Sequence, residues 1–226
     1  MPLLGQAAML LSFDVVAEAI REHDDWHTHE HLRERLSIPG FVRGTRWVAL
    51  AGSPRYCVVY EVEQLSTLTS AAYLERLNNP SPWTTQIMPH YRGMSRGFCT
   101  VAGSFGVGLG NASLWVRFTP SPGSEPSLRA RLLEEVLPQL PSKPGLGSAH
   151  LFEAAATPGM TKEQSIRGAD APVAWVVLVI GYSQDALAEL AQQALGAAQM
   201  EQWGATGVSS ALYRLDYSLS AHDVAA

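Results

Sequence analysis

The stretch I-P-G-F-V-R-G-T-R-W-V-A-L-A-G-S-P-R-Y-C-V-V-Y-E-V, residues 38–62, decides the fold. Pro39-Gly40 ends the helix that precedes it. Residues 42–50 and 56–62 are rich in β-branched and aromatic side chains, which predicts two strands. Because only Gly52-Ser53-Pro54 and its neighbours separate them, the two strands are expected to form a hairpin.

The elements around this hairpin complete a βαββαβ unit. Residues 7–13 predict a first strand, and Asp24 or Asp25 can cap a helix that runs to about Ser37. After the hairpin, residues 68–77 have helical spacing of apolar side chains, and a short irregular segment carries Trp83. The closing strand is expected over residues 97–104.

The second half of the chain repeats this order. Residues 103–110 are glycine-rich and are expected to act as a linker, so the predicted repeats are 1–106 and 107–226. The elements expected in the second repeat are a strand at 113–118, a helix at 128–137, strands at 148–154 and 173–182, a helix at 184–195 and a strand at 208–219. Residues 157–170 are polar, and we expect a mobile loop there.

Two βαββαβ units predict an α+β fold of tandem ferredoxin-like repeats. Each unit forms a four-stranded antiparallel sheet with both helices on one face, which leaves the other face bare. We expect the two sheets to cover each other as an α/β-barrel, whose interior could hold a small ligand.

Composition excludes several classes of function. The net charge is −5 with two lysines, Lys143 and Lys162, so a phosphate-binding surface for nucleic acid is not expected. The longest apolar run, residues 172–181, is too short to span a bilayer, and residues 1–11 are interpreted as a strand rather than a signal peptide. We therefore expect a cytoplasmic protein with no nucleic-acid or membrane partner. Two cysteines, Cys57 and Cys99, are expected to be free thiols.

Strand alternation places Val58, Tyr60 and Val62 under the helices and predicts a polar and aromatic face between the sheets. Its members are Arg43, Trp47, Glu61, Trp115, Arg117 and His150. One interpretation is an ion-pair and packing network in which Arg43 or Arg117 pairs with Glu61. The other is a pocket for an anionic or aromatic organic ligand, because guanidinium and indole groups recognise such molecules. Trp83 could close the opening of this pocket or simply anchor its own loop.

The stretch W-H-T-H-E-H, residues 26–31, concentrates imidazole groups near a helix end. His27, Glu30 and His31 fit the H-x-x-E-H spacing of some zinc enzymes. If Leu32 and Leu36 face the core, regular helix phase turns His29 inward and turns His27 and His31 toward solvent. That orientation disfavours a zinc site, and we expect no metal ion and no cofactor.

These residues resemble the dimeric α/β-barrel superfamily and, within it, the EthD-like proteins. The shared features are a histidine-rich helix, a histidine eight residues before Pro-Gly, and a strand with arginine and an aromatic residue; here they are His31, Pro39-Gly40, Arg43 and Trp47. The resemblance implies ferredoxin-like units, a cavity between sheet and helix start, and small organic ligands. Monooxygenases and lactone isomerases are among the relatives. Its strand order, 4-1-3-2, would separate Cys57 from Cys99 by a strand, at about 9 to 10 Å, and so exclude a disulfide.

The spacing of eight residues to Pro39-Gly40, which the resemblance shares, favours His31 as the residue that faces the cavity, whereas helix phase favours His29. Either imidazole could act as general base or acid toward a phenol, lactone or enol. The sequence thus predicts a small-molecule-binding protein that acts as a cofactor-independent oxygenase or isomerase. One alternative is a non-catalytic protein that associates with itself, as a homodimer, or with a partner. A haem protein is a further alternative, for which the second repeat offers only His150 and His222 as axial ligands.

Overall fold

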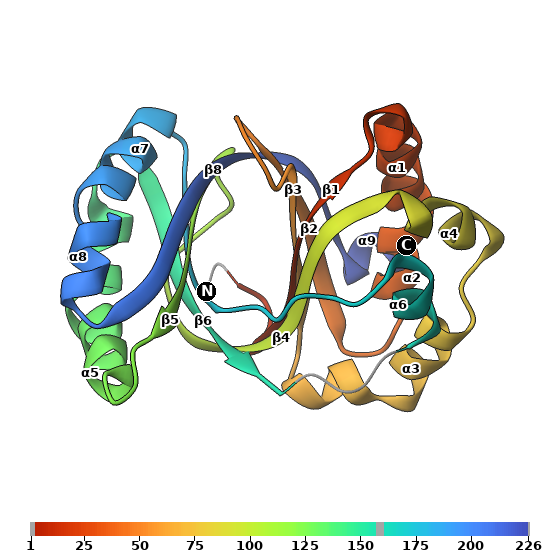
Figure 1. Cartoon of the computed structure of the whole chain (residues 1–226), viewed down its shortest axis with the longest axis horizontal. Helices are drawn as coiled ribbons and strands as arrows, with labels where there is room; N and C mark the ends of the chain where they lie inside the picture. Colours follow the sequence, from red (N-terminus) through yellow and green to blue (C-terminus); the bar gives the residue numbers. More distant parts are fainter. Residues whose placement is uncertain (1–2, 157–160, 226) are drawn as a thin grey trace. The chain divides into compact units, whose positions relative to one another are not determined.

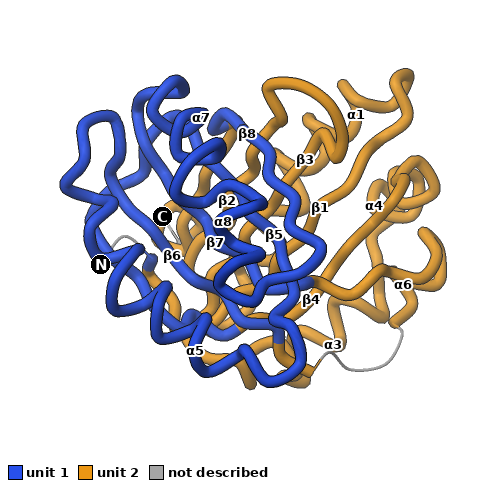
Figure 2. The backbone as a smooth tube through the Cα atoms, turned by 60° about the vertical axis from the view of Figure 1, so that its left-hand side comes forward, with its two compact units in different colours: residues 1–3, 100–154, 174–215 blue, residues 4–99, 155–173, 216–226 orange. Residues whose placement is uncertain are grey.

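The computed structural model describes residues 3–156 and 161–225 (Figure 1). Its contacts divide the chain into two compact units (Figure 2). Unit 1 consists of residues 1–3, 100–154 and 174–215, and unit 2 consists of residues 4–99, 155–173 and 216–226. Unit 2 therefore takes its last two segments from the second half of the sequence, and unit 1 takes its first segment from the N-terminus. The repeat boundary at residues 106 and 107 stays a prediction.

Unit 2 contains the first βαββαβ motif. Its strands are β1 (Ala7–Val15), β2 (Phe41–Ala49), β3 (Tyr56–Val62), the first part of β4 (Tyr91–Gly106) and the last part of β8 (Ala205–Ser220). Its helices are α1 (Ile20–Trp26), η2 (His27–His31), α2 (Leu32–Leu36), α3 (Ala71–Asn78), α4 (Pro82–Ile87), α6 (Lys162–Arg167) and α9 (Ala221–Ala225), with 3-10 turns η1 (Ala17–Ala19), η3 (Leu65–Thr69) and η4 (Met88–His90). Helices α1 to α4 and α6 lie on one side of strands β1 to β4 (Figure 1).

The strand order in unit 2 is β4-β1-β3-β2, which is the order 4-1-3-2 that the resemblance implied. In the antiparallel registers, Met9 of β1 and Gly44 of β2 both lie opposite Tyr60 of β3. Cys57 on β3 and Cys99 on β4 are buried free thiols on opposite sides of β1, so the expected absence of a disulfide between them is confirmed.

Unit 1 repeats this order as β8-β5-β7-β6. Its further strands are β5 (Ala112–Pro120), β6 (Leu146–Ala155) and β7 (Trp175–Gly181), and its helices are α5 (Glu125–Ala130), the π-helical η5 (Arg131–Val136), the 3-10 helix η6 (Leu137–Ser142), α7 (Gln184–Gln192) and α8 (Ala197–Gln202). Helices α5, α7 and α8 lie together on one side of these strands (Figure 1). The predicted α+β class with tandem ferredoxin-like repeats is confirmed.

The helix-facing sides of the two sheets differ in chemistry. In unit 1 that space is filled by apolar side chains such as Leu128, Leu132 and Leu187. In unit 2 the apolar core includes Val58 and Tyr60 of β3, as strand alternation predicted, but buried histidines and arginines lie beside it. Because buried polar groups cost free energy unless they are bonded or paired, these side chains make unit 2 the candidate location of a functional site.

Several predicted boundaries were wrong. The helix expected from Asp24 or Asp25 begins at Ile20, and Asp24 accepts a hydrogen bond from Tyr56 instead of capping a helix. Residues 103–106 belong to β4 rather than to a linker, since both β4 and β8 extend through both units.

Two segments expected to be irregular are helical. The segment that carries Trp83 is α4, because Ser81 caps it by accepting from the Thr84 amide at 2.9 Å. Residues 162–167 of the expected mobile loop form α6, whereas residues 157–160 lie outside the described residues. No helix in the described ranges has the length and apolar character that crossing a membrane requires.

Gly40 sets the turn between α2 and β2, and its replacement gives a testable effect. Its φ of +88° disfavours other residues, and an added Cβ would lie 2.7 Å from Thr67 Oγ1. We expect Gly40→Ala to lower the free energy of unfolding by about 2–3 kcal/mol, measured by urea unfolding. Gly52 has a φ of +78° with no atom within 4 Å of an added Cβ, so Gly52→Ala should cost only about 1–2 kcal/mol. Equal losses in both variants would contradict a role for the contact with Thr67.

Candidate functional site

A row of side chains spaced four residues apart forms the candidate site in unit 2. His23, His27, His31 and Arg35 are 0%, 2%, 8% and 1% exposed. They come from α1, η2 and α2, which follow one another without a break. In a regular α-helix such a row drifts around the axis, because one turn takes only 3.6 residues. The π-helical η2 has wider turns, and this keeps the row on the buried side.

The orientation predicted from helix phase was therefore wrong. His29 is exposed and its Nδ1 lies 2.9 Å from the carbonyl oxygen of Asp25, whereas His27 and His31 are buried. The prediction assumed 3.6 residues per turn through the whole segment, and the π turn changes the phase. The position relative to Pro39-Gly40 favoured His31, which is buried.

Tyrosines of β3 hold the first two histidines. The His27 Nε2 lies 3.1 Å from the Tyr60 hydroxyl, and the His23 Nδ1 lies 3.0 Å from Asp24 Oδ1. The Tyr56 hydroxyl donates to the same Asp24 oxygen at 2.8 Å. These contacts fix the rings between the helix and the sheet.

Each of the three buried imidazoles retains one ring nitrogen without a hydrogen-bond partner among the described residues. These atoms are the Nε2 of His23, the Nδ1 of His27 and the Nδ1 of His31. The rings are close together: the centroids of His27 and His31 are 5.7 Å apart, and His31 packs on Trp26 at 4.3 Å. Because buried polar atoms in proteins are nearly always bonded, this concentration of unbonded nitrogens is unusual and favours a functional role.

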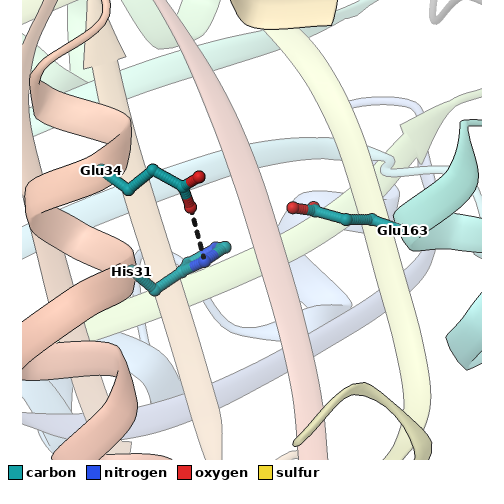
Figure 3. A group of neighbouring side chains, drawn as sticks. All are labelled: His31, Glu34 and Glu163. Carbon is teal, nitrogen blue, oxygen red and sulfur yellow. Dashed lines mark ion pairs between the residues drawn. The ribbon is translucent and has the colours of Figure 1, made fainter. Parts of the chain in front are cut away.

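His31 faces two carboxylates, Glu34 and Glu163, that approach from different helices (Figure 3). Its Nδ1 lies 3.8 Å from Glu34 Oε2, which is beyond hydrogen-bond distance. Arg35 bridges the carboxylates: its Nη2 donates to Glu163 at 2.5 Å and its Nη1 donates to Glu34 at 3.3 Å. A single guanidinium thus serves two carboxylates.

Burial controls the protonation of this cluster. It lowers the pKa of His31 well below 6.5, and the neighbouring Arg35 lowers it further. Burial likewise lowers the pKa of His27 well below 6.5, with Arg46 as the next cause. The pKa of Glu34 is raised because burial outweighs the opposing effect of Arg35. His31 is therefore a neutral imidazole at pH 7, and a partly desolvated carboxylate lies beside it.

His31, Glu34 and Glu163 have the chemistry of metal ligands, and their ligand atoms all lie within 4.8 Å of one another. Arg35 already supplies positive charge to both carboxylates, so we interpret the group as an ion-pair network. His27, Glu30 and His31, the residues of the H-x-x-E-H spacing, do not form a second group of candidate metal ligands among the described residues. Glu30 Oε1 instead accepts hydrogen bonds from Trp26 and Ser81.

Three predicted ligand-binding residues of unit 2 lie apart from the His31 network. Arg43 Nε donates to Glu61 Oε1 at 2.5 Å, so the predicted pairing of Glu61 is realised with Arg43. Trp47 on β2 is buried. Trp83 on α4 is partly buried, and its Nε1 donates to Glu22 at 2.7 Å.

The other three predicted residues lie in unit 1. The Arg117 guanidinium lies 5.5 Å from the ring centroid of Trp115. The two ring nitrogens of His150 lie 3.0 Å from the Ser104 hydroxyl and 3.2 Å from the Ser148 hydroxyl. As a haem ligand His150 does not fit the helix–sheet interior of unit 1, because leucines fill that space and it is Ala149 and Leu151, the neighbours of His150 on β6, that face it.

Sequence reasoning did not identify Arg35 or Glu163. The spacing of four that links His23, His27 and His31 also reaches Arg35, so extending that row would have found it. The signal for α6 was Thr161 three residues before Gln164, a capping pattern in which Gln164 Oε1 accepts from the Thr161 amide at 2.9 Å. Nothing in the sequence indicates that Glu163 meets Arg35.

A pocket of about 490 Å³ opens at the C-terminal end of α2. Leu36, Phe41 and Val224 contribute apolar surface to its lining, and Glu63 contributes a carboxylate. Its lining begins at Leu36, the residue after Arg35, and does not include His31, Glu34 or Glu163.

No protein-family model matches the chain, and no curated protein matches it. Solved structures do. An anthrone oxidase-like protein has a TM-score of 0.68 at 11% identity, with 95% of this chain and 92% of that chain covered. A provisionally named monooxygenase from Fusobacterium nucleatum subsp. nucleatum has a TM-score of 0.62 at 8% identity, with 96% of each chain covered.

Chlorite dismutase from Candidatus Nitrospira defluvii, in complex with imidazole, has a TM-score of 0.56 at 8% identity, with 96% of this chain and 92% of that chain covered. At such low identities the likeness shows the fold alone. The chain thus has the tandem ferredoxin-like α+β fold of these proteins along nearly its whole length.

Proposed function

We propose that unit 2 binds a small organic molecule with an acidic C–H or O–H bond, and that His31 removes this proton so that the molecule can react with O2. The proposal includes the EthD-like relationship, which rests on His31, Pro39-Gly40, Arg43 and Trp47. The observation that carries it is the buried His31 imidazole, neutral at pH 7, with an unbonded Nδ1 directed at Glu34.

The geometry suits His31 as a general base. The Glu34 carboxylate favours the tautomer in which Nδ1 carries the proton, and this leaves the lone pair of Nε2 to accept the proton of the substrate. The imidazolium that forms then has Glu34 as its ion-pair partner. Trp26, which packs on the ring, restricts its rotation.

The chemistry balances without a cofactor. An activated CH2 group loses one proton to His31, and the carbanion transfers two electrons to O2 and forms a C–O bond. The resulting peroxide takes a proton from the imidazolium, and loss of water from the C–OOH group leaves a C=O group. One CH2 and one O2 therefore give one C=O and one H2O. The likeness to an anthrone oxidase-like protein supports this substrate class.

We expect the protein to accelerate O2 uptake by anthrone, whose methylene group is acidic, and His31→Gln to lower kcat/KM at least about a hundredfold. Glutamine keeps the size and polarity of the side chain but cannot act as a base. The measurement is O2 consumption together with formation of anthraquinone. The matched variant is His29→Gln, two residues away and exposed, which should leave kcat/KM unchanged.

Either of two results would contradict the proposal. One is equal turnover by His31→Gln and the wild-type protein when both are folded by circular dichroism. The other is no acceleration by the wild-type protein over the spontaneous oxidation in buffer.

A further inference from the structure

Arg96 is a buried cation on the helix-facing side of β4. Arg96 is 6% exposed. It lies on the same face of the strand as Met94 and Phe98, both of which belong to the core of unit 2. Its guanidinium lies 5.0 Å from the ring centroid of Phe98. The charge therefore lies among apolar and aromatic groups rather than in water.

The contacts of Arg96 are with neutral groups. Its Nη2 donates to the Tyr73 hydroxyl at 2.9 Å, and that hydroxyl donates in turn to the sulfur of Met9 at 3.0 Å. Within residues 3–156 and 161–225, no carboxylate forms an ion pair with Arg96. The remaining residues of the sequence include no aspartate or glutamate.

The other fully buried arginines of unit 2 are paired. Arg35 is bonded to Glu34 and Glu163, and Arg46 Nε donates to Asp216 Oδ2 at 2.7 Å. A buried charge without a counter-ion is costly, and proteins rarely retain one unless a ligand supplies the missing charge. Arg96 differs from its neighbours in this respect.

We propose that Arg96 binds the carboxylate of an aromatic organic ligand. Guanidinium offers a carboxylate two parallel hydrogen bonds, and the rings of Tyr73 and Phe98 offer an aromatic wall beside it. Tyr73 also links Arg96 to the His31 network, because the Arg35 guanidinium lies 5.9 Å from the Tyr73 ring centroid. This inference rests on the proposed function, whose substrate it names as an aromatic carboxylic acid.

The first test compares ligand-free stabilities. We expect Arg96→Met to keep or raise the midpoint of urea unfolding, because it removes a buried charge that has no counter-ion and leaves no carboxylate unpaired. Arg35→Met leaves the carboxylates of Glu34 and Glu163 without their cation and should lower the midpoint. A loss in Arg96→Met as large as that in Arg35→Met would overturn the inference, since it would show that Arg96 has a structural role.

The second test measures binding by calorimetry with two probes of the same shape, 2-naphthoate and its neutral analogue 2-naphthamide. The wild-type protein should bind 2-naphthoate at least about tenfold more tightly, because hydrogen bonds to charged groups are the stronger kind. Arg96→Met should lose this preference and keep its affinity for 2-naphthamide. Arg96→Lys retains the charge without the two-pronged geometry, and we expect an intermediate preference.

Equal affinities of the wild-type protein for the two probes, or no binding of either, would overturn the inference. So would an unchanged preference in Arg96→Met. None of these measurements requires turnover. Binding of 2-naphthoate through Arg96 without any O2 uptake on anthrone would therefore support this inference while contradicting the oxygenase function.

Discussion

Replacing Arg35 by methionine is expected to lower the free energy of unfolding by about 3–5 kcal/mol. Arg35 is 1% exposed and bridges Glu34 and Glu163, so its loss leaves two carboxylates without their cation. Methionine fills a similar volume, which keeps the loss of packing small. The measurement is urea unfolding at pH 7.5, followed by tryptophan fluorescence.

Arg33→Met is the matched control, because Arg33 lies on the same helix and is exposed. It should change the free energy of unfolding by less than about 0.5 kcal/mol. The double variant Arg35→Met/Glu163→Gln should recover part of the lost stability, since it removes one of the two unpaired carboxylates. If Arg35→Met proved no less stable than Arg33→Met, the bridge would not hold α6 against α2.

Acid is expected to destabilise this protein steeply below pH 6.5. Burial lowers the pKa of His23, His27 and His31 in the folded protein, whereas in the unfolded chain these pKa values return to about 6.5. Below that pH the unfolded chain binds more protons, so stability falls as pH falls. Three such groups give a slope of up to about 4 kcal/mol per pH unit, until the folded histidines begin to protonate.

Two carboxyl groups oppose this trend at lower pH. The pKa values of Glu34 and Glu153 are raised in the folded protein, so each binds a proton there before it does in the unfolded chain, and each adds stability as pH approaches 4.5. The histidine effect therefore stands out best between pH 6.5 and 5.5. Urea unfolding at pH 7.5, 6.5 and 5.5 measures it.

The variant His27→Gln should reduce the slope by about one proton, or about 1.4 kcal/mol per pH unit. The matched control is His29→Gln, at an exposed position of the same helical segment. A free energy of unfolding that stayed constant from pH 7.5 to 5.5 would contradict the burial of neutral imidazoles in this interior.

Local sequence patterns predicted the elements that depend on neighbouring residues. Alternation in residues 56–62 placed Val58 and Tyr60 under the helices, and Gly52-Ser53-Pro54 marked the hairpin. The pairing of Glu61 with Arg43 was one of the predicted alternatives, because both residues face the same side of adjacent strands. These features arise from steric preferences over a few residues, so a single sequence can report them.

The histidine row shows where this reasoning fails. A periodicity of 3.6 predicted that His29 faces inward, and the π turn at His27–His31 reversed the result for His31. A π turn inserts its extra residue where tertiary packing stabilises it, and no residue type marks its position.

The sequence by itself determined the two ferredoxin-like repeats, their strand patterns and a histidine-rich helix before Pro39-Gly40. Only the tertiary structure decided that Glu163, 128 residues from Arg35, completes the network beside His31, and that Arg96 has no carboxylate partner in the part of the chain that the structure describes. Element type follows from short-range sterics, which each segment carries within itself. The partner of a buried charge is selected by the packing of segments that are distant in the chain, and only the folded structure specifies that packing.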